Sequence, residues 1–392
     1  MTSRGRNIVL AVSFPVMIFA VVGGFMGRTL SARQDSYQYL RIFEDVVTLI
    51  LNNYVEEPNV DEVMHGAMHG LADGLDPDSA FLSVEQTRVW DQKPPPVATA
   101  GTGLELTRQY YLRVIAARDG SPAATAGLRP GDYIRAIDGQ STRDVSVVAG
   151  SKLLQGTPGS RVRLTVLRGN AAEPRDIEIT REVLAAVPVR SRMASPGTGY
   201  VRVAEFAAES AQQLRSEIVN LGKSGATRLV IDLRGTAFGD VDAGVAAARL
   251  FIASGTLAYR QERGQEKQAI ASAADASGII TWPVALLTDL GTSGPAELFA
   301  ASLKDNKRAS LVGERTLGRA GRQKLVRLPN GSALLLTHVT YLTPTGAVIH
   351  EKGVTPDVVV EQPDFDFGSA PPTEDATLQK AIEQLASLAK AA

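Results

Sequence analysis

The segment from Val284 to Gln323 constrains the fold of this chain more than any other stretch. It begins with an apolar run typical of a buried strand, passes through a turn of glycine, threonine, serine and proline, and continues from Ala296 to Leu303 with helical apolar spacing. A second strand, Ser310 to Gly313, leads into a glycine-rich loop. Backbone amides at such a turn point outward, and the helix dipole adds positive potential. The segment therefore predicts a place where a nucleophile would lie beside oxyanion donors.

The chain around this segment predicts α/β layering. A strand at Gly199–Val203, a helix at Ser210–Leu221 and a buried strand at Arg228–Arg234 follow one another, which is the order expected for parallel strands joined by a helix. Further along, Leu334–Val339 and Tyr341–Pro344 are expected to form a hairpin-like pair.

The last residues predict a linker and a helix. Phe365–Thr373 contains two prolines and is expected to be a linker, and Ala376–Ala391 has the spacing of an amphipathic helix. Its apolar face, formed by Leu378, Ile382, Leu385 and Leu388, could dock on the core or on a second copy of the chain.

The central segment resembles two motifs of the carboxyl-terminal processing (tail-specific) serine peptidases, which carry a Ser-Lys dyad. Their first motif is similar to G-S-A-S-A-S-E, and Gly291–Glu297 reads G-T-S-G-P-A-E. Their second is similar to G-E-x-T-F-G-K-G-x-x-Q, and Gly313–Gln323 reads G-E-R-T-L-G-R-A-G-R-Q. In this register the nucleophile position falls on Gly294 and the general-base position on Arg319, while Gln323 matches the closing glutamine.

Both dyad positions are therefore substituted. A dyad needs a hydroxyl that attacks and an amine that loses its proton near neutral pH, as a desolvated lysine does. Arg319 stays protonated, and Gly294 has no side chain. We expect a relative that binds peptide tails and has lost or impaired peptidase activity. The alternative is an active endopeptidase that uses Ser293, one residue earlier, with Lys304 or Lys324 as base; otherwise Ser293 is a turn serine or helix N-cap.

The resemblance also implies an oxyanion region. The family follows the strand at Arg228–Arg234 with a loop similar to N-N-P-G-G, whose backbone helps to form the oxyanion hole. Here the loop reads G-T-A-F-G, so that Phe238 stands at a glycine position, before Gly239. Pro295 begins the helix on the other side of this region.

A second domain resembles a PDZ domain. The resemblance rests on Gly101–Leu106 and on Gly120–Ile134, which reads G-S-P-A-A-T-A-G-L-R-P-G-D-Y-I. Gly103 lets the backbone turn, so that the amides near Leu104, Glu105 and Leu106 can face a carboxylate while the strand edge adds a peptide. The expected partner is a C-terminal peptide tail; the alternative is a PDZ fold that serves only in packing.

The N-terminus predicts a membrane anchor. Arg4 and Arg6 precede an apolar run from Ile8 to Gly27, which is long enough to cross a bilayer. Arg28 and a weak cleavage signal favour an uncleaved anchor over an export signal, with the rest of the chain extracytoplasmic, as in the periplasm.

Other classes of function find little support. The formal net charge is -1 with no basic cluster, which argues against a nucleic-acid partner, and the absence of cysteine removes thiol chemistry. His65 and His69 have helical metal-ligand spacing but lack a third ligand, so we expect neither a metal nor a cofactor. A Ser-His-Asp triad with His338 or His350 is an alternative that the resemblance does not support.

The expected organisation is multidomain α/β, with the ClpP/crotonase-like layering that the resemblance implies for the core. Residues 1–34 are the signal or anchor, 35–92 a helical region with helices at Tyr37–Leu51 and Val60–Leu75, and 97–185 the PDZ domain after a proline-rich linker. Residues 186–362 are the peptidase-like core, and 363–392 the linker and terminal helix.

Overall fold

The computed structural model describes residues 37–91, 100–169, 173–273, 278–361, 367 and 374–391. It divides into a unit that ends at Met68 and a larger unit that begins at His69. Residues 37–53 of the first unit form a helix, and α2 (Val60–Asp73) begins in the same unit, as the apolar spacing predicts. No helix among the described residues is long and apolar enough to cross a membrane. The expected anchor, Ile8–Gly27, lies outside the described residues.

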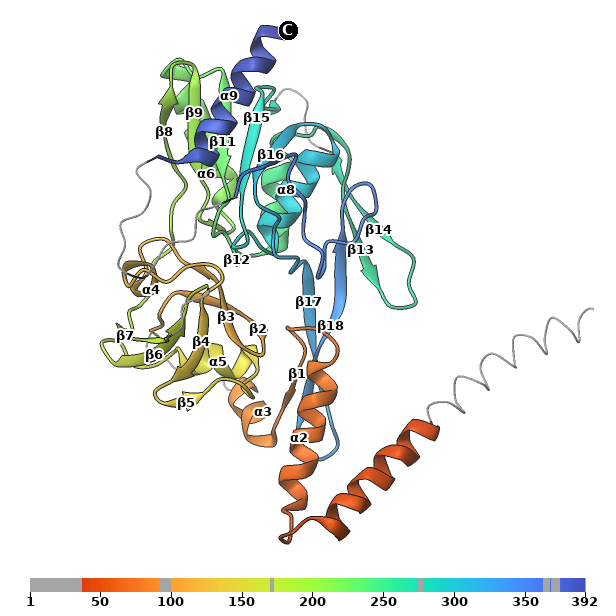
Figure 1. Ribbon diagram of the computed structural model, residues 1–392. Coiled ribbons are helices and arrows are strands. Elements are labelled where there is room, and N and C mark those ends of the chain that lie inside the picture. The colour runs from red at the N-terminus through yellow and green to blue at the C-terminus, as the bar shows by residue number, and fades with distance from the viewer. Residues whose placement is uncertain are drawn as a thin grey trace, which may run out of the picture. The chain divides into compact units, whose positions relative to one another are not determined.

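The first sheet of the larger unit has the strand order β2-β3-β4-β6-β7, with β5 paired to β4 (Figure 1). Its side chains form a core of their own, which includes Leu106, Ile134 and Leu164. Ser121 and Ser146 cap the two helices that accompany it. The elements are β2 (Leu104–Gln109), β3 (Tyr111–Ala117), α4 (Pro122–Thr125), β4 (Tyr133–Ile137), β5 (Gln140–Ser141), α5 (Val147–Leu153), β6 (Arg161–Leu167) and β7 (Arg175–Thr180).

The second sheet has the order β19-β16-β15-β11-β9-β8 and is parallel except for β8, which confirms the predicted α/β layering. Apolar runs such as Leu229–Ile231 are buried on both faces, as parallel sheets require. The elements are β8 (Arg190–Ser195), β9 (Thr198–Arg202), α6 (Ser210–Lys223), β11 (Arg228–Asp232), α7 (Val241–Ala248), β15 (Val284–Thr288), α8 (Pro295–Asp305), β16 (Ala309–Gly313) and β19 (Val358–Val359).

Helices cover both faces of this sheet. Leu229 and Ile231 point into the large core that α6, α7 and α8 share, whereas Val230, between them, points to the opposite face. There α9 (Ala376–Ala391) lies against β11 and β15 (Figure 1), with Leu378, Ile382 and Leu385 in the shared apolar cluster. The terminal helix therefore docks on the core of its own chain.

The third sheet is antiparallel, with the order β1-β18-β13-β14 and β17 paired to β18. The predicted hairpin between Leu334–Val339 and Tyr341–Pro344 is wrong, because Ala333–Leu342 is one strand, β18. Its hairpin partner is β17, and the chain turns at Asn330-Gly331, a pair suited to tight turns. The remaining elements are β1 (Ala80–Leu82), α3 (Val84–Asp91), β10 (Glu205–Phe206), β12 (Phe238–Gly239), β13 (Ser254–Glu262), β14 (Gln268–Ala273) and β17 (Gly321–Arg327).

Candidate functional site

Gly294 forms a sharp turn between β15 and α8. It caps α8 with φ 59° and ψ −115°, a conformation that costs a non-glycine residue about 1–3 kcal/mol. Sharp turns of this kind, between a strand and a helix, can present a nucleophile. A Cβ built on Gly294 would meet nothing closer than the carbonyl oxygen of Arg319, at 3.8 Å. The position therefore has room for a small side chain but carries none.

Glu297 joins this turn to the loop of the second motif. Its Oε2 accepts hydrogen bonds from the backbone N–H groups of Gly294 at 2.9 Å and Arg319 at 2.8 Å. Its Oε1 accepts from the N–H of Gly318 and the hydroxyl of Thr316, both at 2.5 Å. Burial raises the pKa of Glu297, while these donors oppose the shift. One buried carboxyl group thus holds the backbones of Gly294 and Arg319 next to each other.

The Arg319 side chain is held by two carboxylates. Its Nε lies 2.6 Å from Asp78 Oδ1, and its Nη1 donates to Glu105 Oε1 at 2.5 Å and to the carbonyl oxygen of Leu106 at 3.2 Å. Burial alone would lower the pKa of Arg319, but Asp78 and Glu105 outweigh burial and raise it. The guanidinium is therefore locked in its charged form and cannot accept a proton as a base does.

Ser293 directly precedes Gly294, and Gly294 rather than Ser293 is the N-cap of α8. Ser293 is 1% exposed, and its backbone N–H donates to the carbonyl oxygen of Thr236 at 3.0 Å. Lys304 lies at the far end of α8, roughly 15 Å along the helix, where it pairs with Asp357 at 3.0 Å. The structure does not bring Lys304 to Ser293.

Lys324 is exposed on β17. Gln323, on the same strand, donates to Thr337 Oγ1 at 3.3 Å. His338 Nδ1 lies 3.3 Å from the carbonyl oxygen of Arg322, an ordinary strand contact. His350 Nδ1 would lie 3.4 Å from a Cβ on Gly321, in the turn that packs on the second-motif loop. Within the described residues, no group of three or more His, Asp or Glu side chains could hold a metal ion.

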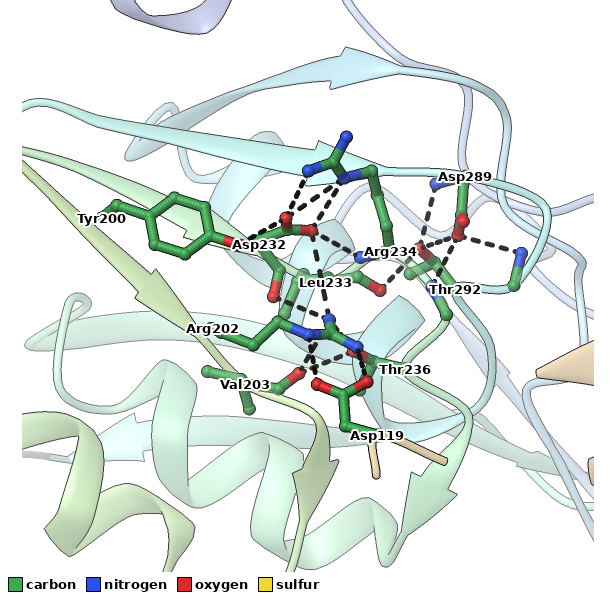
Figure 2. Close-up of polar contacts among 12 residues, drawn as sticks. Asp119, Tyr200, Arg202, Val203, Asp232, Leu233, Arg234, Thr236, Asp289 and Thr292 are labelled. Carbon is green, nitrogen blue, oxygen red and sulfur yellow. Dashed lines mark hydrogen bonds and ion pairs between the residues drawn. The ribbon is translucent and has the colours of Figure 1, made fainter. Parts of the chain in front are cut away.

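Asp289 joins the expected oxyanion loop to the turn that precedes α8. Its Oδ1 accepts from the N–H groups of Gly235 and Gly291, each at 2.9 Å, and from Thr292 Oγ1 at 3.1 Å (Figure 2). Burial raises the pKa of Asp289, with Asp232 contributing in the same direction. Two loops that are far apart in sequence thus share one acceptor.

Asp232, the last residue of β11, belongs to a cluster of charged side chains directly before this loop. Figure 2 shows Tyr200 and Arg234 bonded to Asp232, with Tyr200 Oη donating to Asp232 Oδ2 at 2.8 Å. Although burial opposes it, the guanidinium of Arg234 holds the pKa of Asp232 below its ordinary value. Arg234 also pairs with Asp375 at 2.7 Å, just before α9. These contacts attach the terminal helix to the strand that leads into the loop.

The loop positions are constrained by close packing. A Cβ on Gly239, whose φ is 116°, would lie 2.2 Å from the carbonyl oxygen of Phe206. Phe238 is half-buried, and the guanidinium carbon of Arg118 lies 5.8 Å from its ring centroid. Pro295 is buried at the first position of α8, which suits proline.

The PDZ-like sheet meets this region directly. Arg202, beside the loop, pairs with Asp119 at 2.8 Å, and Arg118 pairs with Glu205. Directly before β2 of this sheet, Gly103 has φ 83°, and a Cβ on it would lie 2.2 Å from the Cβ of Ser121. The sequence indicated the glycine but not these ion pairs, since no local pattern marks partners so far apart.

Comparisons with known proteins agree with this architecture. Residues 197–360 match the model of peptidase family S41, and residues 113–168 match a PDZ domain. A carboxyl-terminal-processing protease of Synechocystis sp. is 31% identical over 346 residues, covering 86% of this chain and 80% of that protein. A carboxy-terminal-processing protease of Bartonella bacilliformis is 28% identical, covering 88% and 83% of the two chains.

A solved structure, described as a photosystem II D1 C-terminal processing protease, superposes with a TM-score of 0.67 at 26% identity, covering 82% of this chain and 92% of that one. The two matched domains lie in the same order as the two resemblances described above. With this identity and coverage, the chain belongs to the carboxyl-terminal-processing serine protease family, peptidase family S41, and it contains a PDZ domain.

Proposed function

We propose that this chain binds C-terminal peptide tails and has lost most or all of its peptidase activity through substitution of both dyad positions. One observation carries the proposal: at the turn where a nucleophile would lie, Gly294 has no side chain, and the neighbouring base position is an arginine paired with Asp78 and Glu105. A hydroxyl and a proton acceptor must act together, and neither is supplied at these positions.

Tail binding is supported by the β2 edge. Gly103 has the positive φ that a carboxylate-accepting loop requires, and within the described part of the chain β2 pairs only with β3. A tail can therefore add to β2 as a further strand, with its carboxylate at the amides near Leu104. The division into an anchor (1–34), a helical region (35–92), a PDZ domain (97–185), a core (186–362) and a terminal region (363–392) belongs to the same proposal.

We also propose that residues 8–27 anchor the chain and that the rest acts outside the cytoplasm on exported proteins. Two arginines followed by an apolar run long enough to cross a bilayer support this placement.

The test is hydrolysis of unfolded casein and labelling by a fluorophosphonate probe, with the wild type and Ser293→Ala compared. We expect neither hydrolysis nor labelling above background in either protein. Robust wild-type turnover that Ser293→Ala abolishes would overturn the proposal in favour of the Ser293 peptidase.

A further inference from the structure

The free edge of β2 presents a specific set of backbone groups. The carbonyl oxygen of Gly103 accepts from the N–H of Arg118 at 2.8 Å, so it points toward β3. The ladder with β3 shifts register between Glu105 and Leu106, and the carbonyl oxygen of Leu106 accepts its hydrogen bond from Arg319, a residue outside the sheet. A peptide that adds to this edge needs that oxygen as an acceptor for its own N–H.

Arg319 already donates a hydrogen bond to this oxygen. Its Nη1 lies 3.2 Å from the carbonyl oxygen of Leu106 and 2.5 Å from Glu105 Oε1, although Glu105 and Arg319 are 214 positions apart in sequence. The guanidinium is anchored behind this contact by Asp78, whose side chain is 4% exposed. Its backbone is fixed by Glu297. Asp78 and Glu297 thus hold Arg319 in place while its guanidinium contacts β2.

We propose that the Arg319 guanidinium is an internal occupant of the peptide-accepting edge of β2, and that a C-terminal tail binds only by displacing it. This inference rests on the proposed binding of tails to β2. A tail N–H and the guanidinium cannot both take the position in front of the Leu106 oxygen. The substituted base position therefore has a role in this chain: it lowers the affinity of the PDZ domain for its ligand.

The contact also defines the chemistry of the ligand. A tail that displaces Arg319 leaves the carboxylate of Glu105 without its cation, at a half-buried position where an unpaired charge is unfavourable. A tail that carries lysine or arginine on the side facing Glu105 replaces that cation. The favoured ligand is a tail with a free carboxylate, apolar last residues and a basic residue shortly before them.

The test uses the full chain and a fluorescent peptide with a free carboxylate and an apolar last residue, with binding followed by anisotropy. Arg319→Gln removes the occupant, and Glu105→Gln weakens its contact with β2 while leaving the pair with Asp78 in place. We expect each variant to bind about tenfold more tightly than the wild type, the effect of losing one charged hydrogen bond that competes with the ligand. The double variant should gain little more, because both changes remove one contact.

Arg322→Gln is the matched control, since this arginine pairs with Asp240 and Asp242 on the core and should leave affinity unchanged. Unchanged or weaker binding by both Arg319→Gln and Glu105→Gln would overturn displacement while tail binding stands. If none of the proteins binds the free peptide, or all bind its amidated form equally well, the proposed function itself fails, and displacement fails with it.

Discussion

The backbone N–H groups of Gly294 and Arg319 donate to the same oxygen, Oε2 of Glu297, at 2.9 and 2.8 Å. The two positions that we propose as the substituted dyad are therefore held together through the main chain, independently of the side chains there. The turn therefore does not need a side chain at either position to keep its shape. Because the geometry depends on Glu297, it can be tested separately from the chemistry.

Restoring both dyad side chains should restore hydrolysis. Gly294→Ser with Arg319→Lys returns to these positions a hydroxyl and an amine, which unlike a guanidinium can lose its proton, and either change alone should do far less, because the two act as a unit. The positive φ of Gly294 should cost the serine variant about 1–3 kcal/mol of stability. Casein hydrolysis by the two single variants and the double variant measures the effect.

Adding Phe238→Gly should raise the restored activity, since the resemblance places a glycine there in the oxyanion loop. Ser293→Ala in the restored background is the control and should change turnover little. Equal activity of either single variant and the double variant would contradict the dyad interpretation.

Glu297→Gln should destabilise the core by about 1–3 kcal/mol, because the amide nitrogen would face an N–H donor in a buried site. Thermal or urea unfolding measures this. Glu178→Gln is the control: that carboxylate is exposed and pairs with Arg161 on the surface, so its loss should cost well under about 1 kcal/mol.

The wild type and Glu297→Gln can also be compared across pH. Burial raises the pKa of Glu297, so the folded state binds more protons than the unfolded state between the unfolded pKa, about 4.3, and the raised folded value. The stability advantage of the wild type over Glu297→Gln should therefore be largest below that window and shrink as pH rises through it. A growing advantage would mean that the hydrogen bonds outweigh burial.

Gly103→Ala should abolish tail binding, because its Cβ would lie 2.2 Å from the Cβ of Ser121 in the carboxylate loop. Gly120→Ala is the matched control: Gly120 also has positive φ, 73°, but a Cβ there meets nothing within 4 Å. Anisotropy with the free-carboxylate peptide compares the two. Similar losses in both variants would point to backbone strain alone.

Tails with lysine before their apolar end should bind the wild type more tightly than matched tails with glutamate. The preference should disappear in Glu105→Gln, whose neutral amide no longer favours a cation. Competition between the two peptides measures it, and a preference that survives in Glu105→Gln would place the selectivity elsewhere.

If residues 8–27 anchor the chain, the expressed protein should sediment with membranes and resist extraction by high salt or alkali. Fractionation followed by N-terminal sequencing checks this. A soluble product that begins near Arg33 would show a cleaved signal instead.

The sequence by itself determined the two matched domains and the α/β class of the core. It also assigns the dyad positions to Gly294 and Arg319, which stays a prediction. These rest on local signals: motif spacing, apolar periodicity and glycines that the backbone requires. The hairpin prediction was wrong because it also relied on a local signal. β-branched and apolar residues continue through Val339–Tyr341 without a break, and the turn at Asn330-Gly331 pairs β18 with β17 instead.

Only the tertiary structure decided what surrounds Arg319. Asp78 and Glu105 come from segments far from Arg319, and their charges count only because the fold buries them against its guanidinium. Likewise, the sequence left open whether the apolar face of the terminal helix packs on the core or on a second copy of the chain. In the structure it covers the face of the sheet that carries Val230 and Leu287. Ion pairs and docking faces depend on distances in space, which no local pattern of residues encodes.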